Sequence, residues 1–399
     1  MESSHIFTPP GELCARREKL QQYMQDQDID GALILQNADL FYFSGTIQQG
    51  QLYIPAEGEP VLMIRKDFER AKSESSLPQV ISFRSPRQLP EILKKQGISL
   101  PAKLGMELDV LPAGQYLAFT EILEKTRIVD ISRTIRLVRA VKSSYEISLI
   151  REAVRFSDHL AGFVPEVLRE GMTEVELAGR IEAEARRCGH QGLVRMRLFG
   201  GELFYGHVMA GWTAAEPSYL ASPTGGAGVS PAMAQGASLR PISRHEPVLL
   251  DLVFVLGGYI SDHTRIFSIG DLPDDLAAAH NVMLEVQDMV KQAARPGVQA
   301  GDLYEMALAK AEDQGLGEYF MGAGDQRIRF VGHGVGLELD EFPFLARGQK
   351  LALEAGMVIA LEPKAIFPGR GVVGIENTHV VRENGLEQFG VCPESVKVL

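Results

Sequence analysis

Four carboxylates and one histidine in the C-terminal half of the chain are the residues whose types and spacing best suit chemistry. They are Asp251, Asp262, His333, Glu362 and Glu376. Each lies in an apolar, strand-like run or beside glycines, where a side chain can approach others closely. Taken singly, such an aspartate or histidine more often serves a turn or a cap. As an ordered set of mostly carboxylate oxygens with one imidazole, they predict a site for Mn, Fe, Co or Zn.

A hairpin is expected to bring the two aspartates together. Residues 248–267 hold two apolar runs around a Gly-Gly dipeptide, which tolerates the positive φ angles of a tight turn. With this dipeptide as the turn centre, Asp262 lies opposite Val253 and on the same face as Asp251, because side chains alternate along a strand. The two carboxylates would be diagonal neighbours about 7 Å apart. In these apolar surroundings two ionised carboxylates are costly unless a cation or a hydrogen-bond donor compensates, and one or two divalent ions would do so.

The two glutamates need a less regular hairpin. Residues 356–381 hold two apolar stretches around the turn signal Pro-Gly-Arg-Gly. A four-residue loop would place Glu376 opposite Pro363, which is the wrong face for joining Glu362. An odd loop, or a one-residue bulge at Pro363, would bring the two carboxylates together.

These motifs resemble those of the creatinase and Xaa-Pro aminopeptidase family, the prolidase-like M24 metallopeptidases with the pita-bread fold. The matching motifs are VLLD and SDHTR within 248–265, GHGVGL at 332–337, ALEP at 360–363 and GIEN at 374–377. Upstream segments that are similar to the family's linker and N-terminal domain are RAVKSSYEISLIREA at 139–153 and GALILQNADLFYFSG at 31–45. The resemblance implies an α+β fold, with a creatinase-type α/β domain at 1–138 and a pita-bread catalytic domain at 139–399.

The same resemblance implies a role for each member of the set. Asp251 would bind one divalent ion, His333 and Glu362 would bind a second, and Asp262 and Glu376 would bridge the two. Glu362 would also be the general base. Two ions about 3.5 to 4 Å apart activate a water molecule and polarise the scissile carbonyl. The expected protein is therefore a dinuclear-metal-dependent aminopeptidase or dipeptidase that cleaves Xaa-Pro or similar bonds of small peptides, and it is expected to be a homodimer.

The residues around the set depart from the family pattern. Peptidases of this family usually carry a second histidine seven residues after the ligand histidine, where this chain has Asp340. They carry another where this chain has Ser218, and Gly374 and Asn377 stand where Arg and Asp are common. Two alternatives therefore stay open: a non-peptidase C–N hydrolase of the creatinase type, and a catalytically impaired peptide-binding protein.

Two residues could replace the missing histidines, which bind substrate and oxyanion in the peptidases. Asp340 could relay a proton if a neighbour raised its pKa, or could pair with a cationic group of the substrate. His207 could reach the site from the adjacent strand, although a half-buried histidine satisfied by backbone is the alternative. A Gly- and Ala-rich segment at 222–238 is expected to be a long loop that shapes access.

Composition indicates a globular enzyme. The chain has 399 residues, of which 45% are hydrophobic and 23% charged, enough for two domains with cores of their own. No apolar stretch reaches the roughly 18 residues of a membrane span, and the N-terminal stretch lacks the order of a signal peptide. Three widely spaced cysteines without a ligand pattern agree with a reducing cytoplasm. The net charge of −12 argues against nucleic acid as a partner.

Helices are expected to flank the strands that carry the site. In the N-terminal domain they are expected at 11–28, 87–96 and 114–125. In the catalytic domain, the patterns Ser143-x-x-Glu146 and Thr173-x-x-Glu176 are capping boxes that predict helix starts. Further helices are expected at 274–295 and 300–315. The order of helices followed by a carboxylate-bearing hairpin therefore occurs twice, which suggests a pseudo-repeat with the site between its copies.

Overall fold

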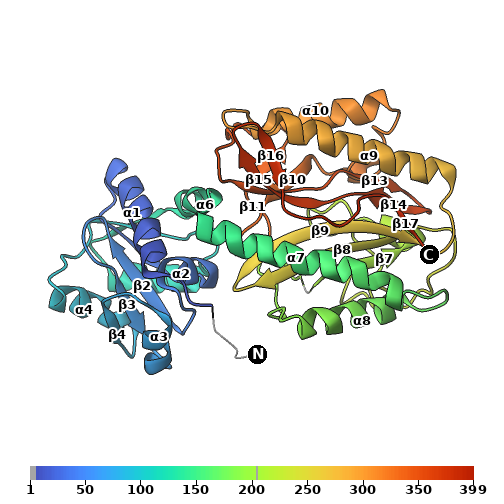
Figure 1. Cartoon of the computed structure of the whole chain (residues 1–399). Coiled ribbons are helices and arrows are strands. Elements are labelled where there is room, and N and C mark those ends of the chain that lie inside the picture. The colour runs from blue at the N-terminus through green and yellow to red at the C-terminus, as the bar shows by residue number, and fades with distance from the viewer. Residues whose placement is uncertain (1–5, 204) are drawn as a thin grey trace. The chain divides into compact units, whose positions relative to one another are not determined.

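The computed structural model describes residues 6–203 and 205–399, so the first five residues and residue 204 lie outside the described part. The chain divides into two compact units, Met1–Arg139 and Ala140–Leu399 (Figure 1). The expected domain boundary, after residue 138, lies one residue from this division. Among the described residues, no helix combines the length and the apolar character that a membrane crossing requires.

The N-terminal unit is an α/β domain, as expected. Its described residues form a six-stranded mixed sheet in the order β4-β3-β2-β1-β5-β6. The strands are β1 Gly31–Ile34, β2 Gly50–Pro55, β3 Val61–Ile64, β4 Val80–Ser82, β5 Lys103–Met106 and β6 Arg127–Asp130. The helices are α1 Pro10–Asp26, α2 Asn37–Ser44, α3 Phe68–Glu74, α4 Leu89–Lys95, α5 Ala113–Ile122 and α6 Ser132–Ala140.

Two larger sheets and one small one form the C-terminal unit over its described residues. One sheet has the order β17-β9-β8-β7, the other β11-β10-β12-β15-β16, and β13 pairs with β14. The strands of the first sheet are β7 Gly206–Ala210, β8 Val248–Leu256, β9 Tyr259–Ser268 and β17 Lys397–Val398. The other strands are β10 Phe330–Gly334, β11 Glu341–Ala346, β12 Val358–Leu361, β13 Lys364–Phe367, β14 Gly371–Gly374, β15 Asn377–Arg382 and β16 Gly385–Gln388.

A pair of helices precedes the carboxylate-bearing strands in each half of this unit. The helices are α7 Ser144–Val167, α8 Glu174–Arg187, α9 Asp274–Ala293 and α10 Ala300–Asp313. Helix α7 packs along β8 and β9, and α8 packs on β7, whereas α9 and α10 pack on each other and on the strands of the second half (Figure 1). The order of elements expected from the sequence is therefore present in both halves.

Both predicted capping boxes are formed. The Ser143 side chain accepts a hydrogen bond from the backbone N–H of Glu146, and that glutamate's side chain accepts one from the Ser143 N–H. Thr173 and Glu176 make the same reciprocal pair at the start of α8. Each box satisfies N–H groups that the first turn of a helix leaves without a partner, which fixes where α7 and α8 begin.

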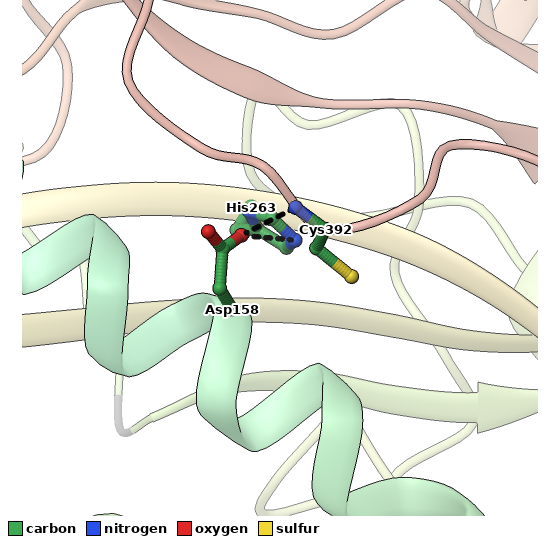
Figure 2. Close-up of side chains that lie close together, drawn as sticks. All are labelled: Asp158, His263 and Cys392. Atoms are coloured by element: carbon green, nitrogen blue, oxygen red, sulfur yellow. Dashed lines mark hydrogen bonds and ion pairs between the residues drawn. The ribbon is translucent and has the colours of Figure 1, made fainter.

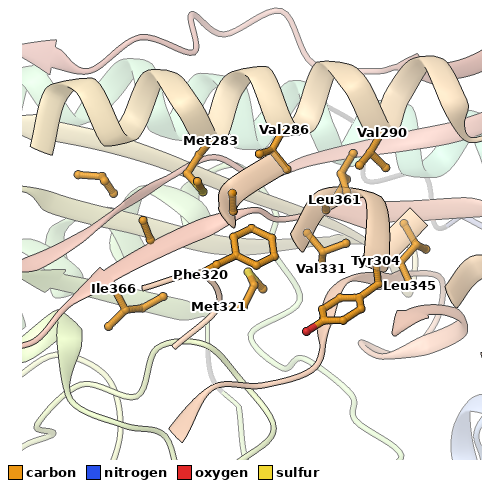
Figure 3. Packing of buried hydrophobic residues seen from close by; sticks show 14 of the residues in the cluster. Met283, Val286, Val290, Tyr304, Phe320, Met321, Val331, Leu345, Leu361 and Ile366 are labelled. Atoms are coloured by element: carbon orange, nitrogen blue, oxygen red, sulfur yellow. The ribbon is translucent and has the colours of Figure 1, made fainter. Parts of the chain in front are cut away.

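The core beneath α9 fixes the strand end that carries Glu362. Met283, Val286 and Val290 point from α9 toward Phe320 and Leu361 (Figure 3). Leu361 is fully buried and directly precedes Glu362. Because interiors are close-packed, this contact holds the backbone at the end of β12 in one position.

Truncating this core should lower stability. We expect Met283→Ala to lower the free energy of unfolding by about 2 to 5 kcal/mol, since Met283 is fully buried and its removal leaves a cavity. The matched control is Asn281→Ala, an exposed position on the same helix, which should change stability by less than about 0.5 kcal/mol. Urea unfolding followed by circular dichroism measures both. Equal effects of the two substitutions would contradict the placement of this core.

Candidate metal centre

The aspartate hairpin has the register that the sequence predicts. Val253 pairs with Asp262, and Asp251 pairs with Thr264. The two glycines of the turn have positive φ angles of 56° and 89°. Asp251 and Asp262 therefore share one face of the hairpin, as expected. Asp262 is buried, and Asp251 is partly exposed.

The glutamate hairpin contains the odd loop that the expected pairing required. The pairing of β13 with β14 ends at Phe367 opposite Gly371, so the loop holds three residues, 368–370. Strands β12 and β15 continue the same register on the far side of the two glutamates. Glu362 and Glu376 consequently lie opposite each other, and a bulge at Pro363 is not needed.

His333 and three of the carboxylates converge on one point. His333 Nε2 lies 3.7 Å from Asp262 Oδ2, 3.6 Å from Glu362 Oε1 and 4.0 Å from Glu376 Oε1. Donor atoms of Asp262, His333 and Glu376 all lie within 4.8 Å of one another. Ligand bonds to a divalent transition ion are about 2.0 to 2.2 Å long, so small side-chain movements would let these donors bind a single ion. The donor set therefore fits at least one ion.

A hydroxyl joins the two sheets at this point. Thr264 of β9 donates its hydroxyl hydrogen to Glu376 Oε2 at 2.8 Å, and its backbone forms an isolated bridge with Glu376. The aspartate hairpin and the glutamate hairpin are thereby held together. This contact places the carboxylates of one sheet beside those of the other.

A sixth residue, Lys364, occupies the same site and was not predicted. Its Nζ donates hydrogen bonds to Asp251 Oδ2 at 3.0 Å, Glu362 Oε2 at 2.8 Å and Glu376 Oε2 at 2.9 Å. The side chain is 1% exposed. The sequence did contain a signal, because Lys364 is two residues after Glu362, and side chains two apart on extended backbone share a face.

Burial and mutual repulsion perturb the acids of the site. Burial raises the pKa of Glu376 to about 7, although the Lys364 ammonium works against this rise. Burial and the Glu376 carboxylate raise the pKa of Asp262 well above its usual value. For His333, burial alone would lower the pKa, but Asp340 and Glu362 raise it above the ordinary value. A divalent cation favours ionised ligands, so protons and metal compete for these groups.

The ligand set faces a pocket with an apolar wall. That wall consists of Met196, Leu198, Leu203, Leu220, Val253, Phe330 and Leu339. Ser222 and Gln235 also line the pocket, which places part of the predicted access loop at 222–238 beside the site. The expectation that this loop lies near the site is confirmed.

The two proposed helper residues both line the pocket. His207 of β7 pairs with Asp251, is buried, and places Nε2 3.4 Å from Gln235 Oε1. This contact gives the ring a side-chain partner. Burial lowers the pKa of His207, which keeps the ring neutral near pH 7. Asp340 Oδ1 lies 3.5 Å from His333 Nδ1, on the side away from the carboxylates.

Ser218, in contrast, is not part of the described pocket lining. Its hydroxyl accepts a hydrogen bond from the Leu220 N–H at 3.0 Å, as in a local turn. The position that carries a histidine in the peptidases therefore contributes no side chain to this pocket.

A second cluster lies on the other face of β9. His263 Nε2 is 4.0 Å from Asp158 Oδ1, which also accepts a hydrogen bond from the Cys392 N–H at 3.3 Å (Figure 2). Because side chains alternate along a strand, His263 points away from the face that carries Asp262. The cysteine spacing showed no such grouping, since Cys392 is far from the other two residues in sequence. In the structure the cluster ties α7 to the C-terminal segment.

Metal affinity should depend on pH through Glu376. With a pKa of about 7 in the metal-free protein, this carboxyl is mostly protonated below pH 7, and an ion must displace that proton. We expect the dissociation constant for Mn²⁺ to fall as the pH rises toward 7, with protons released on binding from Glu376 and from Asp262, whose pKa is also raised. Isothermal titration calorimetry in buffers of different ionisation enthalpy measures both quantities. An affinity that is constant from about pH 5 to pH 8 would contradict this assignment.

Comparison with known proteins agrees with this geometry. Residues 148–383 match the model of metallopeptidase family M24, and residues 16–141 match that of the creatinase/prolidase N-terminal domain. The Xaa-Pro dipeptidase of Pyrococcus furiosus is 29% identical over 380 residues, covering 94% of this chain and 97% of the relative. The Xaa-Pro dipeptidase of Lactobacillus delbrueckii subsp. lactis is 28% identical over 393 residues, covering 96% and 98%.

Solved structures show the same architecture. The prolidase from Pyrococcus horikoshii OT3 superposes with a TM-score of 0.79 at 27% identity, covering 95% of this chain and 99% of that one. Dipeptidase PepE from Mycobacterium ulcerans superposes with a TM-score of 0.81 at 26% identity, covering 98% and 99%. The predicted resemblance, the pita-bread fold and the class of a metal-dependent exopeptidase are confirmed. The family model covers more than half of the chain, and on this ground the protein belongs to metallopeptidase family M24.

Proposed function

We propose that this protein is a dipeptidase or aminopeptidase that hydrolyses Xaa-Pro or similar bonds of short peptides with a divalent ion held by Asp262, His333 and Glu376. The observation that carries the proposal is the convergence of these three donors within 4.8 Å of one another in a pocket. The names of the dipeptidase relatives support the substrate class. The apolar pocket wall supports it too, because a proline ring is a compact apolar group.

The chain's own residues divide the work of hydrolysis. A divalent ion bound at this site would polarise the scissile carbonyl and lower the pKa of a water molecule. Glu362 has one oxygen, Oε1, on the His333 side, where it can accept the proton of the attacking water. The Gly334 carbonyl oxygen at 3.2 Å and Asp340 Oδ1 at 3.5 Å face the other ring nitrogen of His333 and together orient the imidazole.

The part of the pocket that would bind substrate lacks the histidines usual in the family. Two other residues, His207 and Asp340, can bind substrate there. A neutral His207 has one N–H, which faces the Gln235 Oε1 acceptor at 3.4 Å and would turn from it to donate to the substrate carbonyl or to the oxyanion. Asp340 is 35% exposed at the pocket, where an ionised carboxylate can pair with the ammonium of a peptide N-terminus. A short peptide with a free amino end suits this arrangement.

Three further points stay predictions. Manganese is proposed as the ion, with Co, Zn and Fe as alternatives, because oxygen-rich sites with one imidazole suit all four. A homodimer is proposed from the family resemblance. A cytoplasmic location is proposed because the cysteines Cys14, Cys188 and Cys392 are free thiols.

A creatinase-type C–N hydrolase is the second candidate. Lys364 favours it, because a buried ammonium already neutralises part of the carboxylate charge that metal ions would otherwise balance. Hydrolysis of a small amidine or cyclic amide without hydrolysis of peptides would select this candidate over the peptidase.

The peptidase proposal predicts turnover of Xaa-Pro dipeptides. We expect release of free proline after loading with Mn²⁺, Co²⁺ or Zn²⁺, and loss of the activity after chelation. A dipeptide whose second residue is acidic serves as the control substrate, because the apolar wall should disfavour it. Amino-acid analysis measures the products. No turnover of any di- or tripeptide by protein with bound metal would show that the peptidase proposal is wrong.

The general base can be tested separately. We expect Glu362→Gln to lower kcat by at least about 100-fold, since general-base catalysis contributes about that much or more. The fold should persist, because the amide keeps the size of the carboxylate. The control is Glu354→Gln, an exposed glutamate in the segment before β12. Unchanged kcat in Glu362→Gln, with metal content equal to that of the unmodified protein, would remove Glu362 as the base.

A further inference from the structure

We infer that the Lys364 ammonium takes the place of one of the two metal ions expected from the family resemblance, so that the centre holds a single divalent ion. This inference rests on the proposed function, because it concerns the same site. It assigns a fixed cation of the chain to the position beside Asp251, and it leaves the His333 side for the ion.

The contacts of Lys364 are those of a fully satisfied buried cation. An ammonium group has three N–H donors. At Lys364 they meet three carboxylate oxygens at 2.8 to 3.0 Å, which is ordinary hydrogen-bond geometry. The acceptors belong to Asp251 on β8 and to Glu362 and Glu376 of the opposite sheet. A metal ion would need the same oxygens at about 2.0 to 2.2 Å, so ion and ammonium cannot occupy this position together.

The carboxylate oxygens are divided between two sides of the site. Lys364 uses Oε2 of Glu362 and Oε2 of Glu376. His333 Nε2 faces Oε1 of both glutamates, together with Asp262 Oδ2. One side of the ligand set is therefore filled by an ammonium. The other side presents an imidazole nitrogen and three oxygens, of which those of Asp262 and Glu376 suffice with the imidazole for one ion and leave Glu362 Oε1 as the base.

A second departure from the family pattern lies directly opposite the lysine. Gly374 pairs with Lys364 across the β13–β14 hairpin. A Cβ at residue 374 would lie 2.5 Å from the Pro363 carbonyl oxygen, 2.7 Å from Lys364 Cα and 2.9 Å from Lys364 Cγ. The φ angle of Gly374 is also +155°, which residues with a side chain rarely adopt. The backbone path that presents Lys364 to the site therefore requires glycine at 374, and the arginine common there in the family does not fit it.

The repulsion among the buried carboxylates explains why a lysine of the chain can replace a bound cation in this site. Buried carboxylates in contact repel one another and need positive charge nearby. Lys364 supplies that charge permanently. It cannot act as a Lewis acid, and its three donors are occupied by carboxylates, so it has no site left for a substrate group. Asp340 at the pocket is the remaining acidic group that can receive a substrate amine.

The number of bound ions tests the inference directly. The full-length protein is stripped with a chelator, saturated with Mn²⁺, freed of excess ion and analysed by inductively coupled plasma mass spectrometry. We expect one Mn²⁺ per chain in the unmodified protein. Lys364→Met, which keeps the length of the side chain and removes its charge, should bind two. The control is Lys142→Met, because Lys142 is also buried and pairs with a carboxylate, Glu341 at 3.0 Å, outside the ligand set; it should still bind one.

Electron paramagnetic resonance of the unmodified protein gives a second measurement that needs no variant. A single Mn²⁺ gives an uncoupled spectrum, whereas two adjacent ions give an exchange-coupled one. We expect the uncoupled spectrum at saturation. If Lys364→Met fails to fold, this spectrum together with the ion count decides the question.

Each outcome separates this inference from the proposed function. Two ions per chain in the unmodified protein, or a single ion in folded Lys364→Met, would overturn the role of Lys364 while peptide hydrolysis could still stand. One ion per chain without hydrolysis of any peptide would support the role of Lys364 and overturn the peptidase. No bound ion at any concentration would overturn both.

Discussion

Repulsion among four carboxylates in one buried site is the constraint on which the catalytic unit depends. Two unit charges about 4 Å apart interact by about 4 kcal/mol at an effective dielectric constant of 20, so the set needs cations or protons to offset the repulsion. Each sheet contributes one pair, and the Thr264 hydroxyl holds the pairs together. The buried ammonium of Lys364 touches members of both pairs. Helices α7 to α10 close the outer faces of these sheets and keep the strand ends in place.

The fold and the ligand set followed from the sequence as far as local rules determine them. The Gly-Gly turn fixed the aspartate register, because it leaves one pairing for the residues beside it. For the glutamate hairpin, the sequence allows two pairings that differ by one residue, since a Pro-Gly-Arg-Gly signal is compatible with loops of three or four residues. Lys364 was overlooked for a different reason. Lysine is not a metal ligand, and only the three-dimensional approach of Asp251 from the other sheet gives its ammonium a third acceptor.

The ligand set and the substrate side of the pocket have diverged to different degrees. All five candidate donors line one pocket, whereas Ser218 is not among the described residues that line it and Asp340 Oδ1 lies 3.5 Å from His333 Nδ1. Residues that bind an ion are constrained by distances of a few tenths of an ångström, whereas residues that bind substrate change with the substrate. A chain can therefore keep the chemistry of a family while its specificity shifts.

Gly374 has a consequence for what can be substituted in this hairpin. A Cβ at 374 would lie 2.5 Å from the Pro363 carbonyl oxygen and 2.7 Å from Lys364 Cα, both backbone atoms that any residue type at 364 presents. The backbone path of the hairpin therefore requires glycine at 374 whatever side chain stands at 364. A larger residue at 374 is compatible with the site only if this backbone shifts, and such a shift would move the lysine away from its three carboxylate partners.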